Sequence, residues 1–187
     1  LVPDVDAATQ RRFDNGHRFE VLARPLAEAI IGDELYPVVG SLGKYSASFD
    51  GLTMLEDTAF EHKTLNDELR AAFADIESAT PASCELIGKS LPVQYRVQME
   101  QQMMVSGAER VLFMASKWSG DELVEAHHCW YIPDAKLRAD IAAGWAQFAE
   151  DLAAYIPVAV VAPVVAAVVE SLPAVVVRVD DDDVEGL

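Results

Sequence analysis

Residues 46–63 read SASFDGLTMLEDTAFEHK, and this stretch decides the fold. It predicts three consecutive strands, over residues 44–49, 52–56 and 59–65. Asp50 and Gly51 form an Asp-Gly pair, which is a strong signal for a hairpin turn between the first two strands. The stretch is therefore expected to fold as a three-stranded meander within one sheet.

The same stretch carries two acidic residues and a lysine. Glu61 and Lys63 are two positions apart, so in a strand their side chains share one face, while the side chain of His62 points to the other. Carboxylates and a backbone carbonyl are ligands that Mg²⁺ accepts, and Mn²⁺ is a second candidate ion. Asp50, Glu61 and the His62 carbonyl are the candidate ligands, and Lys63 is a candidate to orient water or stabilise a phosphate transition state. A solvated hairpin with no function remains the alternative for this pattern taken alone.

Helices and further strands are expected around the meander. Apolar periodicity, capping residues and turn signals predict helices over residues 7–31, 66–73, 92–106 and 134–155, and strands over residues 110–117 and 123–131. This order predicts a mixed α/β domain. In the last helix the apolar side chains share one face, and Trp145 is expected to lie in the core.

Composition limits the class of function. The chain has 187 residues and a net charge of −17, which argues against bulk attraction to nucleic acid. Residues 152–169 are an uncharged run, but Pro157 and Pro163 interrupt it, so a linker is favoured over a membrane helix. The expected domains are residues 1–155, with preceding residues missing, and a Pro/Ala/Val-rich linker with an acidic tail over residues 156–187.

Three motifs, in order along residues 10–155, resemble the lambda-exonuclease and YqaJ group of phage recombinase nucleases in the PD-(D/E)XK superfamily. They are GHRFE at 16–20, SFDGL at 48–52 followed by FEHK at 60–63, and QMEQQMMVSG at 98–107. The resemblance implies a restriction-endonuclease-like core, with a central mixed sheet flanked by helices. Phe49 stands where the family has a proline, and no residue matches the family's pocket for a DNA terminal phosphate.

The resemblance also assigns roles to residues. It implies metal ligands at Glu20, Asp50 and Glu61, beside the His62 carbonyl. It places the catalytic lysine on Lys63 and the active-site glutamine on Gln98, so that the catalytic set is Glu20, Asp50, Glu61, Lys63 and Gln98.

The function implied is a magnesium-dependent DNA nuclease of phage recombination. It would act 5′ to 3′ on linear duplex DNA and leave 3′ overhangs, through attack of metal-activated water on the phosphodiester. The expected partners are duplex DNA, a single-strand annealing protein and further copies of the chain in a ring trimer, in the cytoplasm of a bacterial host of the phage or prophage. Two alternatives stay open: a structure-specific endonuclease with the same metal site, and a non-catalytic module that binds DNA or a recombinase.

Overall fold

The structure is a computed structural model, and it describes residues 6–77, 88 and 90–156. The chain divides into two units, Leu1–Ala153 and Ala154–Leu187. All strands and helices described below lie in the first unit, apart from the last residue of the final helix. The expected linker and acidic tail fall outside the described residues from residue 157 onward. Among the described helices, none combines the length and the apolar character that a membrane crossing needs.

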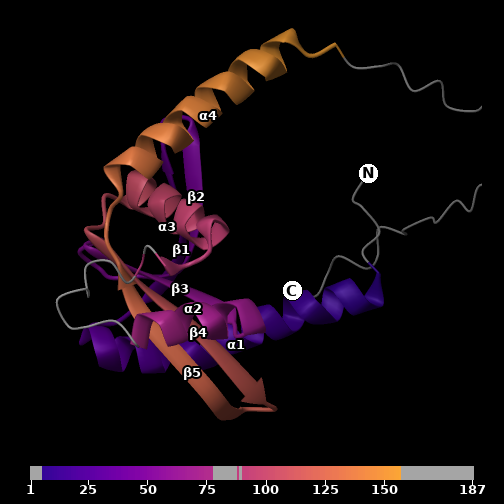
Figure 1. The fold of residues 1–187 in the computed structure, drawn as a ribbon, viewed down its shortest axis with the longest axis vertical. Helices are drawn as coiled ribbons and strands as arrows, with labels where there is room; N and C mark the ends of the chain where they lie inside the picture. The colour runs from indigo at the N-terminus through magenta and orange to yellow at the C-terminus, as the bar shows by residue number, and fades with distance from the viewer. Residues whose placement is uncertain (1–5, 78–87, 89, 157–187) are drawn as a thin grey trace, which may run out of the picture. The chain divides into compact units, whose positions relative to one another are not determined.

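A five-stranded mixed sheet forms the centre of the first unit (Figure 1). In spatial order its strands are β1 (Tyr36–Leu42), β2 (Tyr45–Leu52), β3 (Thr58–Thr64), β4 (Arg110–Ser119) and β5 (Glu122–Tyr131). Neighbouring strands are antiparallel except for β3 and β4, which run parallel. A parallel pair needs a crossover connection, and the two helices between β3 and β4 supply it.

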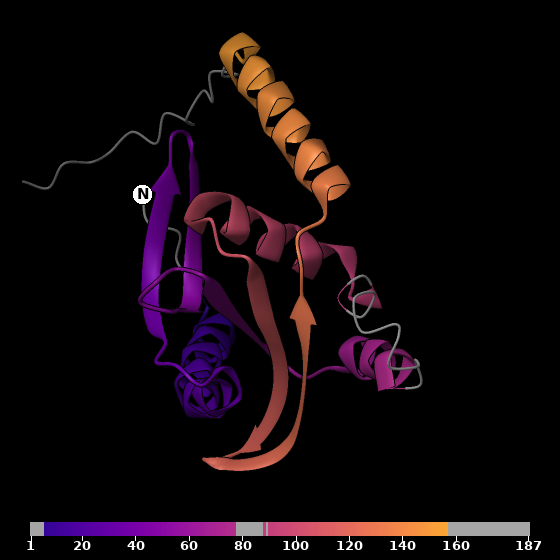
Figure 2. The same cartoon turned by 90° about the vertical axis from the view of Figure 1, so that its left-hand side faces the viewer.

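Helices cover both faces of this sheet (Figure 2). Helix α1 (Ala7–Ile31) packs on one face, where Phe60, Leu112 and Met114 form an apolar cluster with the helix. Helices α2 (Asp67–Glu77) and α3 (Val93–Ser106) lie on the other face, over the larger core. The predicted fold class, a mixed α/β domain with a central sheet flanked by helices, is confirmed.

The helix ends follow the signals in the sequence. The Asn66 side chain caps α2 by accepting a hydrogen bond from Leu69 N at 2.8 Å. Gly32 and Gly107 end α1 and α3 in the left-handed conformation, with φ of 83° and 82°, which glycine adopts without steric cost. Pro25 lies inside α1 without ending it.

The prediction of a hairpin turn at Asp50 and Gly51 is wrong, because both residues lie inside β2. The chain reverses earlier, between Leu42 at the end of β1 and Tyr45 at the start of β2, which pair with each other. The glycine serves packing instead. A Cβ atom added to Gly51 would lie 2.9 Å from the Cβ atom of Leu35, which is closer than real contacts allow. The Asp-Gly pair therefore marks a close approach of the backbone to another segment.

Two further predictions in this region are corrected. The strand expected over residues 52–56 is mostly the turn between β2 and β3, which the Thr53 amide closes by donating to the Thr58 carbonyl at 3.0 Å. The sequence reading also missed β1. Pro37 and Gly40 both weaken a strand signal, and β1 is an edge strand, where a proline is tolerated.

The last helix, α4 (Ala135–Ala154), has the predicted length, but none of its residues is buried. Trp145 was expected in the core and is 41% exposed, and Phe148 is 54% exposed. The helix is held near its start, where Arg138 Nε donates to the buried Glu100 Oε1 at 2.6 Å. Further along, Trp145 Nε1 donates to Gln101 Oε1 at 3.0 Å. The start of its apolar face is half-buried, at Leu137 and Ile141, and from Trp145 onward the large apolar side chains are exposed.

Candidate functional site

A β-bulge in β2 creates the candidate site. On β1, Tyr36 pairs with Leu52 and Val38 pairs with Phe49, so that a single residue of β1 faces Asp50 and Gly51. A bulge of this kind bends the strand and turns a side chain out of its normal direction. The facing residue is a proline, which lacks an amide hydrogen and cannot complete the ladder. Asp50 is thereby taken out of regular pairing.

The strands β2 and β3 part at the bulge. Their ladder contains two residue pairs, Gly51 with Phe60 and Leu52 with Ala59. Beyond these pairs the side chain of Asp50 replaces the missing backbone partner, since His62 N donates to Asp50 Oδ2 at 2.8 Å. The amide and carbonyl of one strand residue point to the same side. The His62 carbonyl therefore faces the same gap between the two strands.

Glu61 lies in this gap with three donors around its carboxylate. It is 1% exposed. Lys63 Nζ contacts Oε1. From α3, Gln98 Nε2 donates to Oε1 at 2.6 Å and Gln102 Nε2 donates to Oε2 at 2.6 Å. The two glutamines are four positions apart, so they leave α3 on the same face. Glu61 is thus fixed from both its own strand and the helix above it.

Negative charge accumulates at the gap. Burial, together with the nearby Glu61 carboxylate, raises the pKa of Asp50 to about 7, although the hydrogen bond from His62 N opposes the shift. Burial by itself would lower the pKa of Lys63, but the carboxylates of Glu61, Asp50 and Glu20 outweigh it and raise that pKa. Lys63 is therefore charged, and its charge is shared among several carboxylates.

The side chain of His62 points to the opposite face, toward α1. Burial lowers the pKa of His62 to about 4, so the ring is neutral at pH 7. Its Nε2 lies 2.7 Å from Ser116 Oγ, which also accepts a hydrogen bond from Trp118 Nε1. With its Nδ1 protonated, the neutral ring can accept through Nε2 the hydrogen bond that the Ser116 hydroxyl donates. The His62 side chain packs on the α1 side of the sheet, while its backbone amide and carbonyl face the gap beside Asp50.

Glu20 stands apart from the other expected residues. It lies on α1 and its Oε2 is 3.3 Å from His17 Nδ1. It is close enough to Asp50 to raise the pKa of that residue. Both acids line one hollow of about 320 Å³, whose walls come from α1, β1 and β2. The lining residues are His17, Glu20, Arg24, Pro37, Val38, Val39, Ser48, Phe49 and Asp50.

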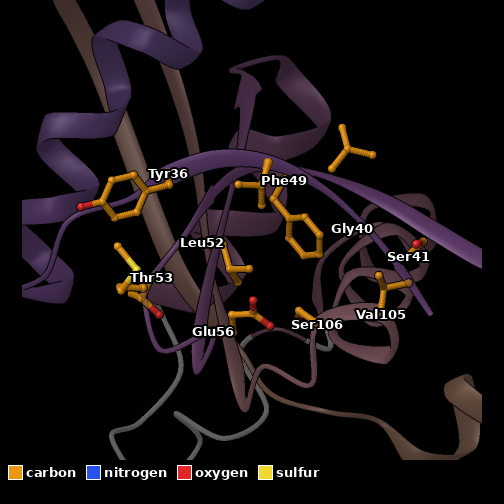
Figure 3. A pocket seen from close by; sticks show the side chains of 12 residues that line it. Tyr36, Gly40, Ser41, Phe49, Leu52, Thr53, Glu56, Val105 and Ser106 are labelled. Carbon is orange, nitrogen blue, oxygen red and sulfur yellow. The ribbon is translucent and has the colours of Figure 1, made fainter.

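A larger hollow lies beside the hairpin of β1 and β2, and its lining differs in chemistry from that of the hollow at Glu20 and Asp50 (Figure 3). It measures about 530 Å³ and is lined mainly by apolar side chains such as Phe49, Leu52 and Val105. Glu56, the described non-glycine residue with a left-handed backbone, also borders it, with φ of 58°. None of the acids, the lysine or the glutamines expected at the site lines this hollow. The smaller hollow is therefore the candidate site, because acidic residues line it and not because of its volume.

The residues at the gap fit a divalent ion. In the described part of the chain, no three His, Cys, Asp or Glu side chains lie close enough to share one ion. Mg²⁺ does not require three, because it is commonly held by one or two carboxylates, with waters and substrate phosphates completing its shell. Asp50, Glu61 and the His62 carbonyl supply such hard oxygen atoms. Burial and the nearby Glu61 carboxylate raise the pKa of Asp50, so a cation bound between the two acids would favour the ionised form of Asp50.

Two residues at the site were not assigned from the sequence. Gln102 holds Glu61 and also donates to Ser48 O at 2.9 Å, so that it spans the gap between β2 and β3. Arg24 Nε donates to Asp50 O at 3.2 Å. Each lies four positions after a residue that was assigned, Gln98 and Glu20 respectively. That helical spacing is the signal that could have found them.

Replacing Asp50 by asparagine is expected to stabilise the ion-free protein, and more so at high pH. The pKa of about 7 in the folded protein lies above the ordinary aspartate pKa of 3.8, so between these pH values the folded protein holds the proton and the unfolded chain does not. Stability from this group is complete below about pH 4 and is lost as pH rises through 7. Melting temperatures in chelator at pH 5 and pH 8 measure this. Each 1 kcal/mol is about 2–4 °C for a domain of this size, and an equal difference at both pH values would contradict the expectation.

Comparisons with known proteins complete the description of the fold. No known protein family model matches the sequence, and no curated protein matches it. Among solved structures, an alkaline exonuclease from Laribacter hongkongensis, LHK-Exo, is similar with a TM-score of 0.54, at 22% identity, over 81% of this chain and 71% of the exonuclease. LHK-Exo in complex with dAMP gives a TM-score of 0.58 over the same shares and at the same identity. This chain therefore has the fold of an alkaline exonuclease.

Proposed function

We propose that the chain is a metal-dependent nuclease that cleaves the phosphodiester backbone of DNA. One observation carries the proposal. The bulge in β2 brings Asp50 beside β3, where Glu61 and Lys63 share the neighbouring strand face. Two acids and a lysine at a break in a sheet, with a hollow that reaches Asp50, suit the hydrolysis of a phosphodiester.

Each residue has a chemical part in this proposal. Asp50, Glu61 and the His62 carbonyl would hold Mg²⁺ or Mn²⁺, with Glu20 facing the same hollow. The chemistry that the ion supplies when bound is neutralisation of phosphate charge and a lowered pKa for water. Lys63 would place its ammonium against the phosphate oxygens as their negative charge grows. Gln98 would keep the Glu61 carboxylate in one orientation.

The fold supports DNA as the substrate. The similar structures are those of an alkaline exonuclease, and one of them contains dAMP, a deoxynucleotide. We extend the proposal to 5′-to-3′ digestion of linear duplex DNA with 3′ overhangs as the product, in phage recombination. An endonuclease would use the same residues, so the kind of DNA that is cut distinguishes the two.

Digestion of linear and covalently closed circular duplex DNA tests the proposal. With Mg²⁺, the full chain is expected to degrade the linear form and leave the circle intact, and chelator is expected to stop the reaction. Labels at the 5′ and 3′ ends report which strand is lost first. Cleavage of the circle would favour the endonuclease alternative. No degradation of either form with Mg²⁺ or Mn²⁺ would contradict nuclease activity.

The remaining alternative is a non-catalytic module that keeps the fold. It predicts no specific uptake of Mg²⁺ or Mn²⁺, which calorimetry measures directly. The annealing partner and the ring trimer stay predictions. The exposed apolar side chains of α4, including Phe148 at 54% and Leu152 at 60% exposure, support self-association of the chain, which light scattering would measure.

A further inference from the structure

Arg24 is a basic side chain in the hollow that leads to the candidate site. It lies one helical turn after Glu20 on α1, so the two side chains leave the helix on the same face. Both line the hollow of about 320 Å³ together with Asp50. The one other basic residue in this lining is His17, whose side chain is 80% exposed and faces Glu20. Arg24 therefore supplies the permanent positive charge of the hollow.

One atom of the Arg24 side chain has a structural task. The bulge removes the Asp50 carbonyl from the regular ladder, and Arg24 Nε donates to it at 3.2 Å. This bond anchors the planar guanidinium at its inner edge. The two terminal nitrogens of Arg24 make no hydrogen bond or ion pair with any residue that the structure describes. A guanidinium held in this way presents its remaining donors in a preorganised fork.

The surroundings make phosphate the fitting ligand. The chain contains 31 acidic residues and 14 lysines and arginines, so a phosphate approaching it meets repulsion over much of its surface. Two acids, Glu20 and Asp50, also line the hollow, so the guanidinium of Arg24 is the group in the lining that can attract a phosphate, and its fork matches the geometry of two phosphate oxygens. The other cation of the site, Lys63, is already in contact with Glu61.

We propose that the terminal nitrogens of Arg24 bind a backbone phosphate of the DNA strand held at the site. This rests on the proposed nuclease function and names the residue through which an acidic chain holds its substrate there. The contact would be to the backbone, so it would be the same for every DNA sequence. Arg24 would act in binding the substrate, while Asp50, Glu61 and Lys63 would act on the bond that breaks.

Arg24→Gln tests the inference, with Arg18→Gln as the matched control on the same helix. Arg18 is exposed, whereas Arg24 is half-buried, and the guanidinium of Arg18 is paired with Asp121 at 2.6 Å and does not line the hollow. Digestion of linear duplex DNA is measured for the full chain at several salt concentrations. We expect Arg24→Gln to raise KM about tenfold with kcat within about twofold, and to lower the slope of log affinity against log salt by about one. Arg18→Gln is expected to match the wild type.

The outcomes separate this inference from the proposed function. If the wild type digests DNA and Arg24→Gln shows the KM and salt slope of Arg18→Gln, the inference is wrong and the nuclease function stands. A loss confined to kcat, accompanied by weaker Mg²⁺ dependence, would show that Arg24 only supports Asp50 and would also overturn the inference. Arg24→Lys keeps the charge and is expected to recover part of the affinity. If the wild type has no activity on any DNA, both the proposed nuclease function and the inference about Arg24 are wrong.

Discussion

Replacing Lys63 by methionine is expected to lower kcat for DNA digestion by about 10²–10³-fold, the usual effect of removing one preorganised charge at a transition state. The methionine keeps most of the length of the side chain and removes the ammonium. In the native protein that ammonium contacts Glu61 Oε1 and is held charged by the surrounding carboxylates. Since it also competes with a metal ion for Glu61, its loss should not weaken Mg²⁺ binding. Rates at saturating DNA over a range of Mg²⁺ concentrations measure both quantities.

Lys136→Met is the control for this variant. Lys136 also pairs with an acid, Asp140 at 2.8 Å, but its side chain is 86% exposed on α4. It is expected to keep full activity. A Lys63→Met protein that folds normally and digests DNA as fast as this control would remove Lys63 from the mechanism. A variant whose activity returns at high Mg²⁺ would instead place Lys63 in ion binding.

Much of the fold could be predicted because each signal was local. Asn66 and Gly107 act within one turn of a helix, and the expected boundaries of α2 and α3 follow from them. The Asp50-Gly51 pair misled because the same dipeptide suits a turn and a close backbone contact. The close contact is with the side chain of Leu35, which is distant in the sequence and lies against Gly51 only in the folded chain. Packing of α4 is a similar case, since apolar periodicity predicts a face but not whether a partner covers it.

Some contacts at the candidate site could also be predicted from local spacing, and others could not. The relation of Glu61 to Lys63 follows from the period of two in a strand, and the relation of Gln98 to Gln102 from the helical turn. The meeting of Asp50 with Glu61 depends on a bulge and on where two strands part, which no local pattern encodes. Only its spacing of four from Glu20 separates Arg24 from Arg18, which lies on the same helix and pairs with Asp121 in the turn between β4 and β5.

Gln102 connects β2 and β3 where their backbones part, and it also holds the carboxylate of Glu61. Its amide nitrogen donates to Glu61 Oε2 on β3 and to Ser48 O on β2, and the residue is 1% exposed. Both neighbours are acceptors, so the amide cannot turn around without placing oxygen against oxygen. Its own Oε1 is buried and has no hydrogen-bond partner among the described residues. The side chain thus gives up one hydrogen bond to keep two strands and one carboxylate aligned.

Gln102→Leu is expected to lower kcat by about 10–100-fold, the usual cost of losing a group that orients a metal ligand, and to raise the Mg²⁺ concentration needed for half-maximal activity. Leucine fills similar space and removes the unpartnered Oε1, but it leaves Glu61 Oε2 and Ser48 O without this donor, so some loss of stability is expected as well. Gln101→Leu is the control from the next position, since Gln101 Nε2 donates to Ser46 O at 3.2 Å and does not contact Glu61. Activity and melting temperature are measured for both variants. If Gln102→Leu lowers the melting temperature sharply while keeping the Mg²⁺ dependence of the wild type, Gln102 holds the sheet together but does not position Glu61.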